Sequence, residues 1–196
     1  MKLRRNVVRE KILQVSRNII LDQGYNKLSI RAIAKKAECS PANLYEYFKN
    51  KGEILEALAD YVSKPLNKNL RDAVRKSQDD PLISLTLAYI DFSRNKKEDF
   101  CLMFSRGILE KRKGNSSLPK STLRTIKSVV EKEIENGKMA TKDCEEAEAI
   151  AYSLMAFAHG LASLDIVKLQ GNKNQRKAAD RKALCSFVAS LRPLEN

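Results

Sequence analysis

The sequence is poor in the residues that form tight turns. Its 7 glycines and 5 prolines make up about 6% of 196 residues, roughly half of the usual share. An all-β protein would need a turn every eight to twelve residues or so, so this composition favours helices. Hydrophobic residues (43%) and charged residues (31%) occur in the proportions of a folded chain rather than a disordered one. At this length we expect one compact unit or two small ones.

Long apolar runs, histidine and paired cysteines are scarce as well. No stretch of 18 apolar residues is present, and the basic start of the chain lacks the apolar segment of a signal peptide. The four cysteines are far apart and form no CxxC pair, so we expect reduced thiols in the cytoplasm rather than disulfides or a zinc site. There is one histidine, and there is no glycine-rich phosphate loop or nucleophile elbow. We therefore expect no enzyme, no metal and no cofactor.

Positive charge is concentrated at the beginning of the chain. Lys and Arg outnumber Asp and Glu by 37 to 24 overall, for a net charge of +13. Residues 1–52 contain twelve basic and four acidic residues, a balance of +8, which is more than half of the excess. A basic module followed by a nearly balanced body favours a nucleic-acid reader attached to another domain. A merely well-solvated surface is the alternative that charge alone leaves open.

The spacing of apolar residues in the basic module predicts three helices. Within residues 4–21 they recur at steps of three and four, which predicts a helix that Gly24 ends. Ser29 can cap a second helix, and Ser40-Pro41 can begin a third that is barely two turns long. Two short helices joined by a tight turn and braced by a longer one form a helix-turn-helix unit. A small helical bundle without a ligand is the alternative.

The start of the third helix is suited to close approach to a duplex. Pro41 and Ala42 are small, and the side chain of Asn43 can pair with a base edge, most naturally that of adenine. The N–H groups at the start of this helix suit phosphate oxygens. The third helix is therefore predicted to enter the major groove.

An ordered set of motifs runs from about Arg9 to Leu58. The motifs are Arg9-Glu10-Lys11-Ile12-Leu13, Gly24-Tyr25, Leu28-Ser29-Ile30-Arg31-Ala32-Ile33-Ala34, Ser40-Pro41-Ala42-Asn43-Leu44-Tyr45, Tyr47-Phe48-Lys49-Asn50-Lys51 and Ile54-Leu55. This set resembles the TetR family of bacterial transcriptional regulators, whereas a generic helix-turn-helix would share only the periodicity. The resemblance implies an all-α protein in which a three-helix DNA-binding domain precedes a helical domain that binds an effector and dimerises.

The resemblance also implies which residues contact DNA. Phosphate contacts would come from Ser29, Tyr45 and Lys51, and the remaining residues would lie against or in the major groove. The full implied set is Ser29, Arg31, Ser40, Pro41, Ala42, Asn43, Tyr45 and Lys51. Glu46 departs from the family pattern, which often has histidine at this position, and its carboxylate would repel a phosphate. It can instead accept from a cytosine amino group or point at Lys49 or Lys51.

The body of the chain predicts further helices, which bring the total to about nine. Apolar residues at nearly constant steps of four predict one long helix from Ile54 to Val74, and Pro65 should kink or split it. Further helices are expected within residues 80–92, 100–108, 123–137, 143–169 and 174–191, with a solvated basic loop at 111–117. The resulting domains are a TetR-type DNA-binding domain at 6–52 (helix-turn-helix about 29–48) and a helical effector-binding and dimerisation domain at 53–196.

The segment 143–169 is apolar nearly all round, which predicts burial on two sides. With the last helix it favours a two-fold four-helix interface between two copies, and a central helix within a monomer is the alternative. The expected interface residues are Ala151, Leu154, Ala158, His159, Ala162, Leu184, Phe187, Val188 and Leu191. The run Ala158-His159-Gly160-Leu161-Ala162-Ser163-Leu164 resembles the HG-motif signature of one TetR C-terminal subclass, which often has a tryptophan shortly before the histidine; this chain has none. His159 can touch a ligand or, more commonly for such a histidine, pack or hydrogen-bond across the interface.

The effector region is expected where the family places it. The candidate pocket residues are Tyr89, Phe92, Phe100, Met103, Phe104 and Phe157, although such residues at helical spacing more often form plain core. An apolar lining favours a hydrophobic or amphipathic small molecule. The sequence thus predicts a homodimeric, sequence-specific DNA-binding transcriptional regulator, a repressor that binds a palindromic operator and is released by a small-molecule effector. A helical interaction or adaptor protein that binds DNA weakly or not at all is the alternative.

Overall fold

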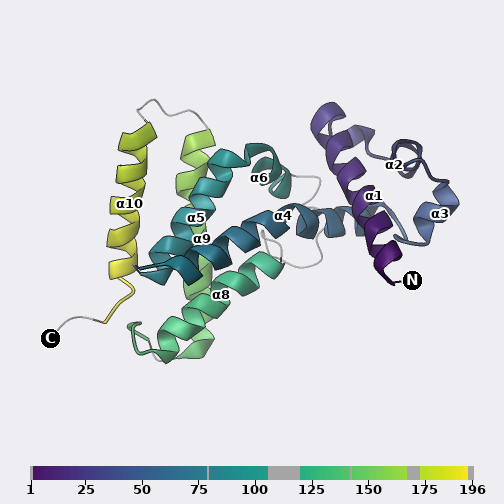
Figure 1. The fold of residues 1–196 in the computed structure, drawn as a ribbon. Helices are drawn as coiled ribbons and strands as arrows, with labels where there is room; N and C mark the ends of the chain where they lie inside the picture. Colours follow the sequence, from purple (N-terminus) through teal and green to yellow (C-terminus); the bar gives the residue numbers. More distant parts are fainter. Residues whose placement is uncertain (1, 79, 106–119, 142, 167–172, 194–196) are drawn as a thin grey trace. The chain divides into compact units, whose positions relative to one another are not determined.

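The described part of the chain is helical. The computed structural model describes residues 2–78, 80–105, 120–141, 143–166 and 173–193. These residues contain nine α-helices and two short 3-10 turns, and no strand, which confirms the predicted all-α class (Figure 1). Within the same residues no helix is both long and apolar enough to span a bilayer. The predicted loop 111–117 lies outside the described residues.

The chain divides into two compact units. The first contains Met1–Lys64 and Glu98–Pro119, and the second contains Pro65–Lys97 and Lys120–Asn196. The division falls inside helix α4 (Lys51–Lys76), which contributes its first half to one unit and its second half to the other. Pro65 does not split this helix, although its missing N–H removes one intrahelical hydrogen bond. The predicted separation of DNA-binding and effector-binding domains between residues 52 and 53 concerns function and stays a prediction.

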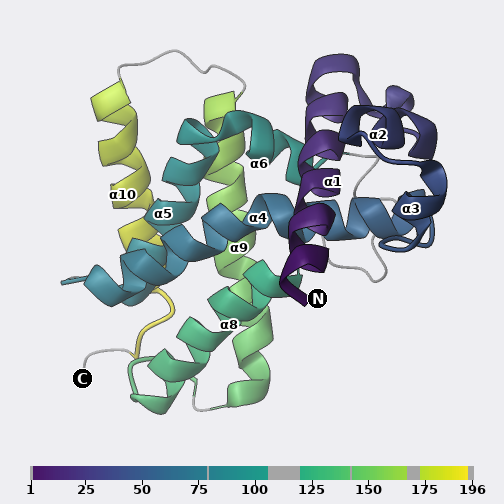
Figure 2. The ribbon, with the colours of Figure 1, turned by 45° about the vertical axis from the view of Figure 1, so that its right-hand side comes forward.

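The first unit is built around three helices of unequal length. These are α1 (Lys2–Gln23), α2 (Ile30–Ala37) and α3 (Pro41–Tyr45), and a 3-10 turn (Tyr25–Lys27) separates α1 from α2. Helix α1 packs against α2, and α2 against α3 (Figure 2). The side chains that close this core are apolar and almost fully buried: Ile12, Ile19, Ile33, Ala34, Leu44, Phe48 and Leu55. Helix α6 (Lys97–Met103) is tied to α1 by the ion pair of Arg17 with Asp99, and this hydrogen bond raises the pKa of Arg17.

Two backbone positions with positive φ set the turns of this unit. Gly24, at the end of α1, has φ 86°, which an L side chain would rarely adopt. Glu38 ends α2 with φ 59° and ψ 42°, in the left-handed region, and its N–H donates to the carbonyls of Ala34 and Lys35. The turn between α2 and α3 therefore places a non-glycine residue where glycine is most easily accommodated.

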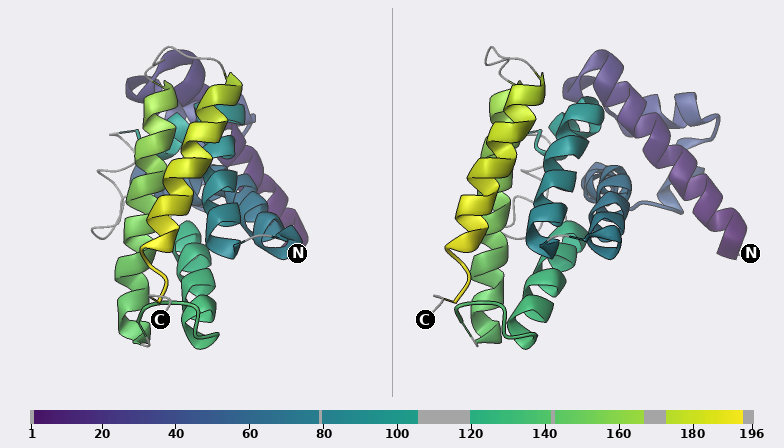
Figure 3. Two further views of the ribbon diagram at one scale, coloured as in Figure 1. Left: turned by 90° about the vertical axis from the view of Figure 1, so that its left-hand side faces the viewer. Right: turned by 60° about the vertical axis from the view of Figure 1, so that its left-hand side comes forward.

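The second unit is a bundle of longer helices. Its members are the second half of α4, α5 (Pro81–Asn95), α8 (Lys120–Glu135), α9 (Ala147–Ile166) and α10 (Lys173–Ala189). Both α5 and α8 pack against α9, and α10 packs against α5. Helices α9 and α10 run side by side (Figure 3), and the rings of Phe157 and Phe187 stack between them with centroids 4.6 Å apart. The bundle thus buries one apolar face of each of these helices, whereas Leu164, on α9, stays 50% exposed.

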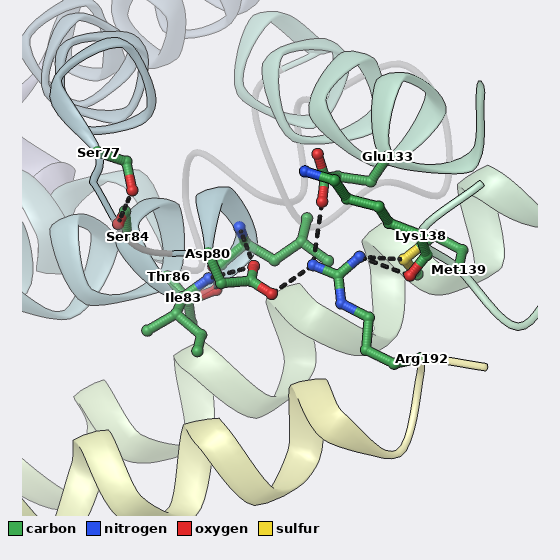
Figure 4. A network of polar contacts seen from close by, with 10 residues as sticks. Ser77, Asp80, Ile83, Ser84, Thr86, Glu133, Lys138, Met139 and Arg192 are labelled. Carbon is green, nitrogen blue, oxygen red and sulfur yellow. Dashed lines mark hydrogen bonds and ion pairs between the residues drawn. The ribbon is translucent and has the colours of Figure 1, made fainter. Parts of the chain in front are cut away.

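A network of charged side chains ties three segments of the bundle together. Asp80 caps α5, with its carboxylate accepting from the N–H groups of Leu82 and Ile83. The same carboxylate pairs with Arg192, just after α10, and Arg192 also reaches Glu133 of α8 at 3.0 Å (Figure 4). The Glu133 side chain is only 4% exposed, so Arg192 supplies the opposite charge that offsets the burial of this carboxylate.

Candidate nucleic-acid interface

Two serines define the starts of α2 and α3. The side chain of Ser29 accepts from the N–H of Ala32 at 3.1 Å, and that of Ser40 accepts from the N–H of Asn43 at 3.0 Å. Both predicted caps are therefore confirmed. A serine hydroxyl that accepts in this way still has its own proton to donate, and both residues are exposed. Each can hold a helix end and donate to a phosphate at once.

Helix α3 has one buried face and one exposed face. Leu44 and Phe48 are 0% and 1% exposed and form the inner face. Ala42 lies on the opposite face and is exposed, Asn43 is half-buried beside it, and the Tyr45 side chain is 52% exposed. The predicted readout residues therefore share the outer surface of α3, which is the arrangement that groove entry needs.

The start of α4 lies next to the 3-10 turn that follows α1. The ammonium of Lys51 lies over the ring of Tyr25, 4.4 Å from its centroid, a contact that fixes the direction of the lysine. The first turn of α4 is capped from both sides, since Asn50 Oδ1 accepts from the N–H of Glu53 at 2.9 Å and Glu53 accepts from the N–H of Lys49 at 2.7 Å. The sequence pattern of Asn50 followed three residues later by Glu53 is a capping-box signal, and sequence reasoning missed it.

Helix α1 holds the far end of α3, a role that sequence reasoning also missed. Arg5 Nη2 donates to the backbone carbonyl of Glu46 at 3.2 Å. The guanidinium of Arg9 lies 4.7 Å from the centroid of the Phe48 ring. No local sequence signal could reveal these contacts, because each joins residues about forty positions apart. They add two arginines to the surroundings of the exposed face.

The predicted effector residues are distributed over both units. Tyr89, Phe92 and Phe157 belong to the second unit, and Phe100, Met103 and Phe104 to the first. All are buried except Phe104 and Phe157, which are half-buried, and the rings of Phe100 and Phe104 are 5.0 Å apart. Their assignment to a pocket stays a prediction.

His159 forms a hydrogen bond within its own chain. Its Nδ1 lies 3.1 Å from the hydroxyl of Tyr89, so α9 and α5 are joined in the bundle. Burial lowers the pKa of His159 and raises the pKa of Tyr89. The pair is therefore a neutral imidazole beside a neutral phenol at pH 7.

Two side-chain oxygens of the second unit are buried without a hydrogen-bond partner among the described residues. They are Oδ1 of Asn67, on α4, and Oγ1 of Thr122, on α8. The amide nitrogen of Asn67 donates to Ser121 Oγ at 3.1 Å, which brings these segments of α4 and α8 together. An unsatisfied buried polar atom costs about 1–3 kcal/mol.

Most of the interface residues predicted on α9 and α10 are buried within a single chain, and their place in a dimer interface stays a prediction. Six of them are at most 2% exposed: Ala151, Leu154, Ala158, Ala162, Leu184 and Val188. His159, Phe187 and Leu191 are half-buried. Alanines occur on both faces of α9, so hydropathy does not separate the inner face from the outer one. The residues predicted from the periodicity of α9 therefore lie mainly on its inner face.

The outer face of α9 is marked by small residues and two large apolar ones. Tyr152 is 67% exposed and Leu164 is 50% exposed. Between them lie Ala156 and Gly160, both exposed, and a Cβ added to Gly160 would meet no atom within 4 Å. A second helix can approach this face closely.

The sequence and the fold both match known proteins. The model of the family described as "Bacterial regulatory proteins, tetR family" matches residues 12–58. No curated protein matches the chain. Among solved structures, a TetR-family transcriptional regulator from Pectobacterium atrosepticum is 20% identical with a TM-score of 0.70, over 98% of this chain and 97% of that one. A protein of unknown function from Rhodococcus sp. RHA1 is 22% identical with a TM-score of 0.70, over 94% and 95%. A TetR family transcription regulator from Marinobacter aquaeolei VT8 is 19% identical with a TM-score of 0.63, over 95% and 98%.

Proposed function

We propose that this chain, whose residues 12–58 match the model of the tetR family of bacterial regulatory proteins, is a homodimeric transcriptional repressor. It binds a palindromic operator in the cytoplasm and leaves the operator when a small molecule binds its second unit. The observation that carries the proposal is the exposed outer face of α3, presented by a unit of strongly positive sequence.

Specific binding on this proposal divides between positioning and reading contacts. Ser29, Tyr45 and Lys51 contact phosphates, which sets the register of the protein on the duplex. The residues that lie along the major groove are Arg31, Ser40, Pro41 and Ala42. The small residues among them let the protein backbone approach the duplex, and Arg31 adds a positive charge. Asn43 reads a base edge, since an amide can both donate to and accept from adenine.

The outer face of α9 supports a dimer. Tyr152, Ala156, Gly160 and Leu164 form an apolar strip that a single chain leaves open, and the same strip on a second copy can cover it. Two-fold symmetry of the protein then requires two half-sites of opposite orientation, about one helical turn of DNA apart or slightly more.

The effector on this proposal is amphipathic. The apolar side chains of the bundle favour a hydrophobic body, and the unsatisfied oxygens of Asn67 and Thr122 favour a donor group on the ligand. A ligand that prefers a conformation with a wider spacing of the two α3 helices shifts the population away from the operator.

The test is selection of random duplex DNA by the purified protein at fixed salt, followed by sequencing. A two-fold-symmetric motif is the expected result. Salt-sensitive binding without any motif would contradict the proposal. The alternative, a helical interaction or adaptor protein, would then describe the chain better.

A further inference from the structure

Glu46 lies at the end of α3, on the same exposed face as Ala42. It follows α3 directly with helical backbone angles (φ −66°, ψ −24°), and its N–H donates to the carbonyl of Asn43. Residues four apart lie on the same face of a helix, so Glu46 extends the line of Ala42. Leu44 and Phe48 are buried on the other side, and Glu46 is exposed. Its side chain therefore projects away from the core of the unit.

The carboxylate of Glu46 has no partner within the described residues. Among the described residues, the one hydrogen bond of Glu46 beyond the backbone of its own turn is accepted by its main-chain oxygen, from Arg5. Pairing with Lys49 or Lys51, which the sequence left open, is not seen, and the ammonium of Lys51 lies over Tyr25 instead. A negative charge at the carboxyl end of a helix is unfavourable, so the fold gains nothing from this carboxylate.

The position of Glu46 is nevertheless fixed from α1. Arg5 binds its carbonyl, and Arg9 covers the ring of Phe48 two residues later. These contacts hold the end of α3 at a defined distance from α1. The backbone that carries the Glu46 side chain is therefore fixed in position. A group held in this way can discriminate between neighbouring bases.

The chemistry of a carboxylate restricts what it can meet in DNA. An ionised carboxylate only accepts hydrogen bonds, and phosphates repel it. In the major groove, guanine and thymine present acceptors at the corresponding edge, whereas cytosine presents its N4 amino group. Adenine presents N6 as a donor but places the N7 acceptor beside it.

Building on the proposed function, we infer that Glu46 is a specificity-determining residue that accepts from the N4 amino group of one cytosine in each half-site. The carboxylate also lowers affinity for every sequence that lacks this cytosine.

Selection and binding measurements with Glu46→Gln test the inference. The wild type is expected to prefer cytosine at one position of each half-site by about fivefold to tenfold over guanine or thymine. In Glu46→Gln this preference should move toward adenine, because an amide pairs with adenine N6 and N7. In Glu46→Ala it should disappear. Both variants keep an exposed position, and their thermal unfolding checks that the fold is retained.

Asp22→Asn is the matched control for charge. Asp22 is exposed on α1, about 25 Å along that helix from Arg5 by the helical rise, and the substitution removes the same single charge. It should leave the selected motif unchanged. If Glu46→Gln selects the wild-type motif and raises affinity for all sequences equally, Glu46 acts by charge alone and the inference is overturned. If the wild type itself selects no motif, the proposed function fails first, so the two failures are distinguishable.

Discussion

At the scale of the residue, short-range rules explain most of the first unit. The hydroxyls of Ser29 and Ser40 cap the helices that follow them, as the sequence predicts. Glu38 is the position that these rules miss, because it ends α2 in the left-handed conformation without being glycine. Its carboxylate forms an ion pair with Lys11 at 3.2 Å, but both side chains are more than half exposed.

Replacing Glu38 by glycine should stabilise the protein. Glycine adopts the left-handed conformation without the steric cost that an L side chain has there, and the exposed ion pair contributes little. We expect the free energy of unfolding to rise by about 0.5–1 kcal/mol in urea titrations. Lys35→Gly, within α2, should lower it by about 1 kcal/mol. A loss of stability in Glu38→Gly would show that the ion pair with Lys11 outweighs the strain.

Replacing Lys51 or Asn43 by alanine should impair DNA binding in two different ways. Lys51→Ala should weaken binding to all sequences and reduce the slope of log K against log salt by about one per chain. Asn43→Ala should relax the preference at one base pair, with a smaller change in salt dependence. Fluorescence anisotropy at several salt concentrations measures both, and Lys132→Ala in the second unit is the control. An unchanged base preference in Asn43→Ala would refute its reading role.

At the scale of the element, the sequence predicts helices better than the contacts between them. Steps of three and four residues identify the helices and most of their buried faces. On α9 they do not separate the two faces, because alanine is compatible with either. The contacts that join distant segments, such as Asp80 with Arg192, have no local pattern and appear only in the folded chain.

Arg192→Ala should destabilise the second unit strongly. It leaves Glu133 buried without its cation and also breaks the pair with Asp80. Removing one partner of a buried ion pair costs about 3–5 kcal/mol, and the partial exposure of Arg192 reduces the expected loss to about 2–3 kcal/mol. Arg75→Ala, which breaks an exposed pair with Asp72, should cost less than about 0.5 kcal/mol. Equal urea midpoints for the two variants would contradict this account.

The pair of His159 and Tyr89 should make stability depend on pH. Burial lowers the pKa of His159 below its ordinary value, so the unfolded chain binds more protons in the interval between the two values. The contribution of His159 to the free energy of unfolding is therefore fully present above about pH 6.5, and it is lost as the pH decreases through this interval. In His159→Asn, whose side-chain oxygen can still accept from Tyr89, the decrease between pH 7.5 and 5.5 should be smaller. Thermal unfolding at both pH values compares them, and equal decreases would exclude His159 as the cause.

At the scale of the whole molecule, the proposed function relates the outer face of α9 to the operator, because a two-fold dimer requires two symmetric half-sites. The sequence predicts two copies, but the residues it assigns to their interface are mostly buried in one chain. Folding decides which face remains open, since that depends on how α5 and α8 cover α9. The open face carries Tyr152, Ala156 and Gly160.

Ala156→Arg should dissociate the dimer without unfolding the chain. Ala156 is exposed on α9, so a long charged side chain is tolerated in the monomer but not between two closely packed helices. Sedimentation velocity should give a monomer for this variant and a dimer for the wild type. Ser128→Arg, exposed on α8, should stay dimeric. A dimeric Ala156→Arg would place the interface elsewhere.

The central claim is that two copies of this chain read two symmetric half-sites together. The most direct measurement compares binding to the selected duplex with binding to the same duplex in which one half-site is scrambled, at equal salt. The account predicts two chains on the intact site, and an affinity for the altered site that falls at least about a hundredfold, toward that for random DNA. Equal affinity for both duplexes, or one chain bound to the intact site, would contradict it.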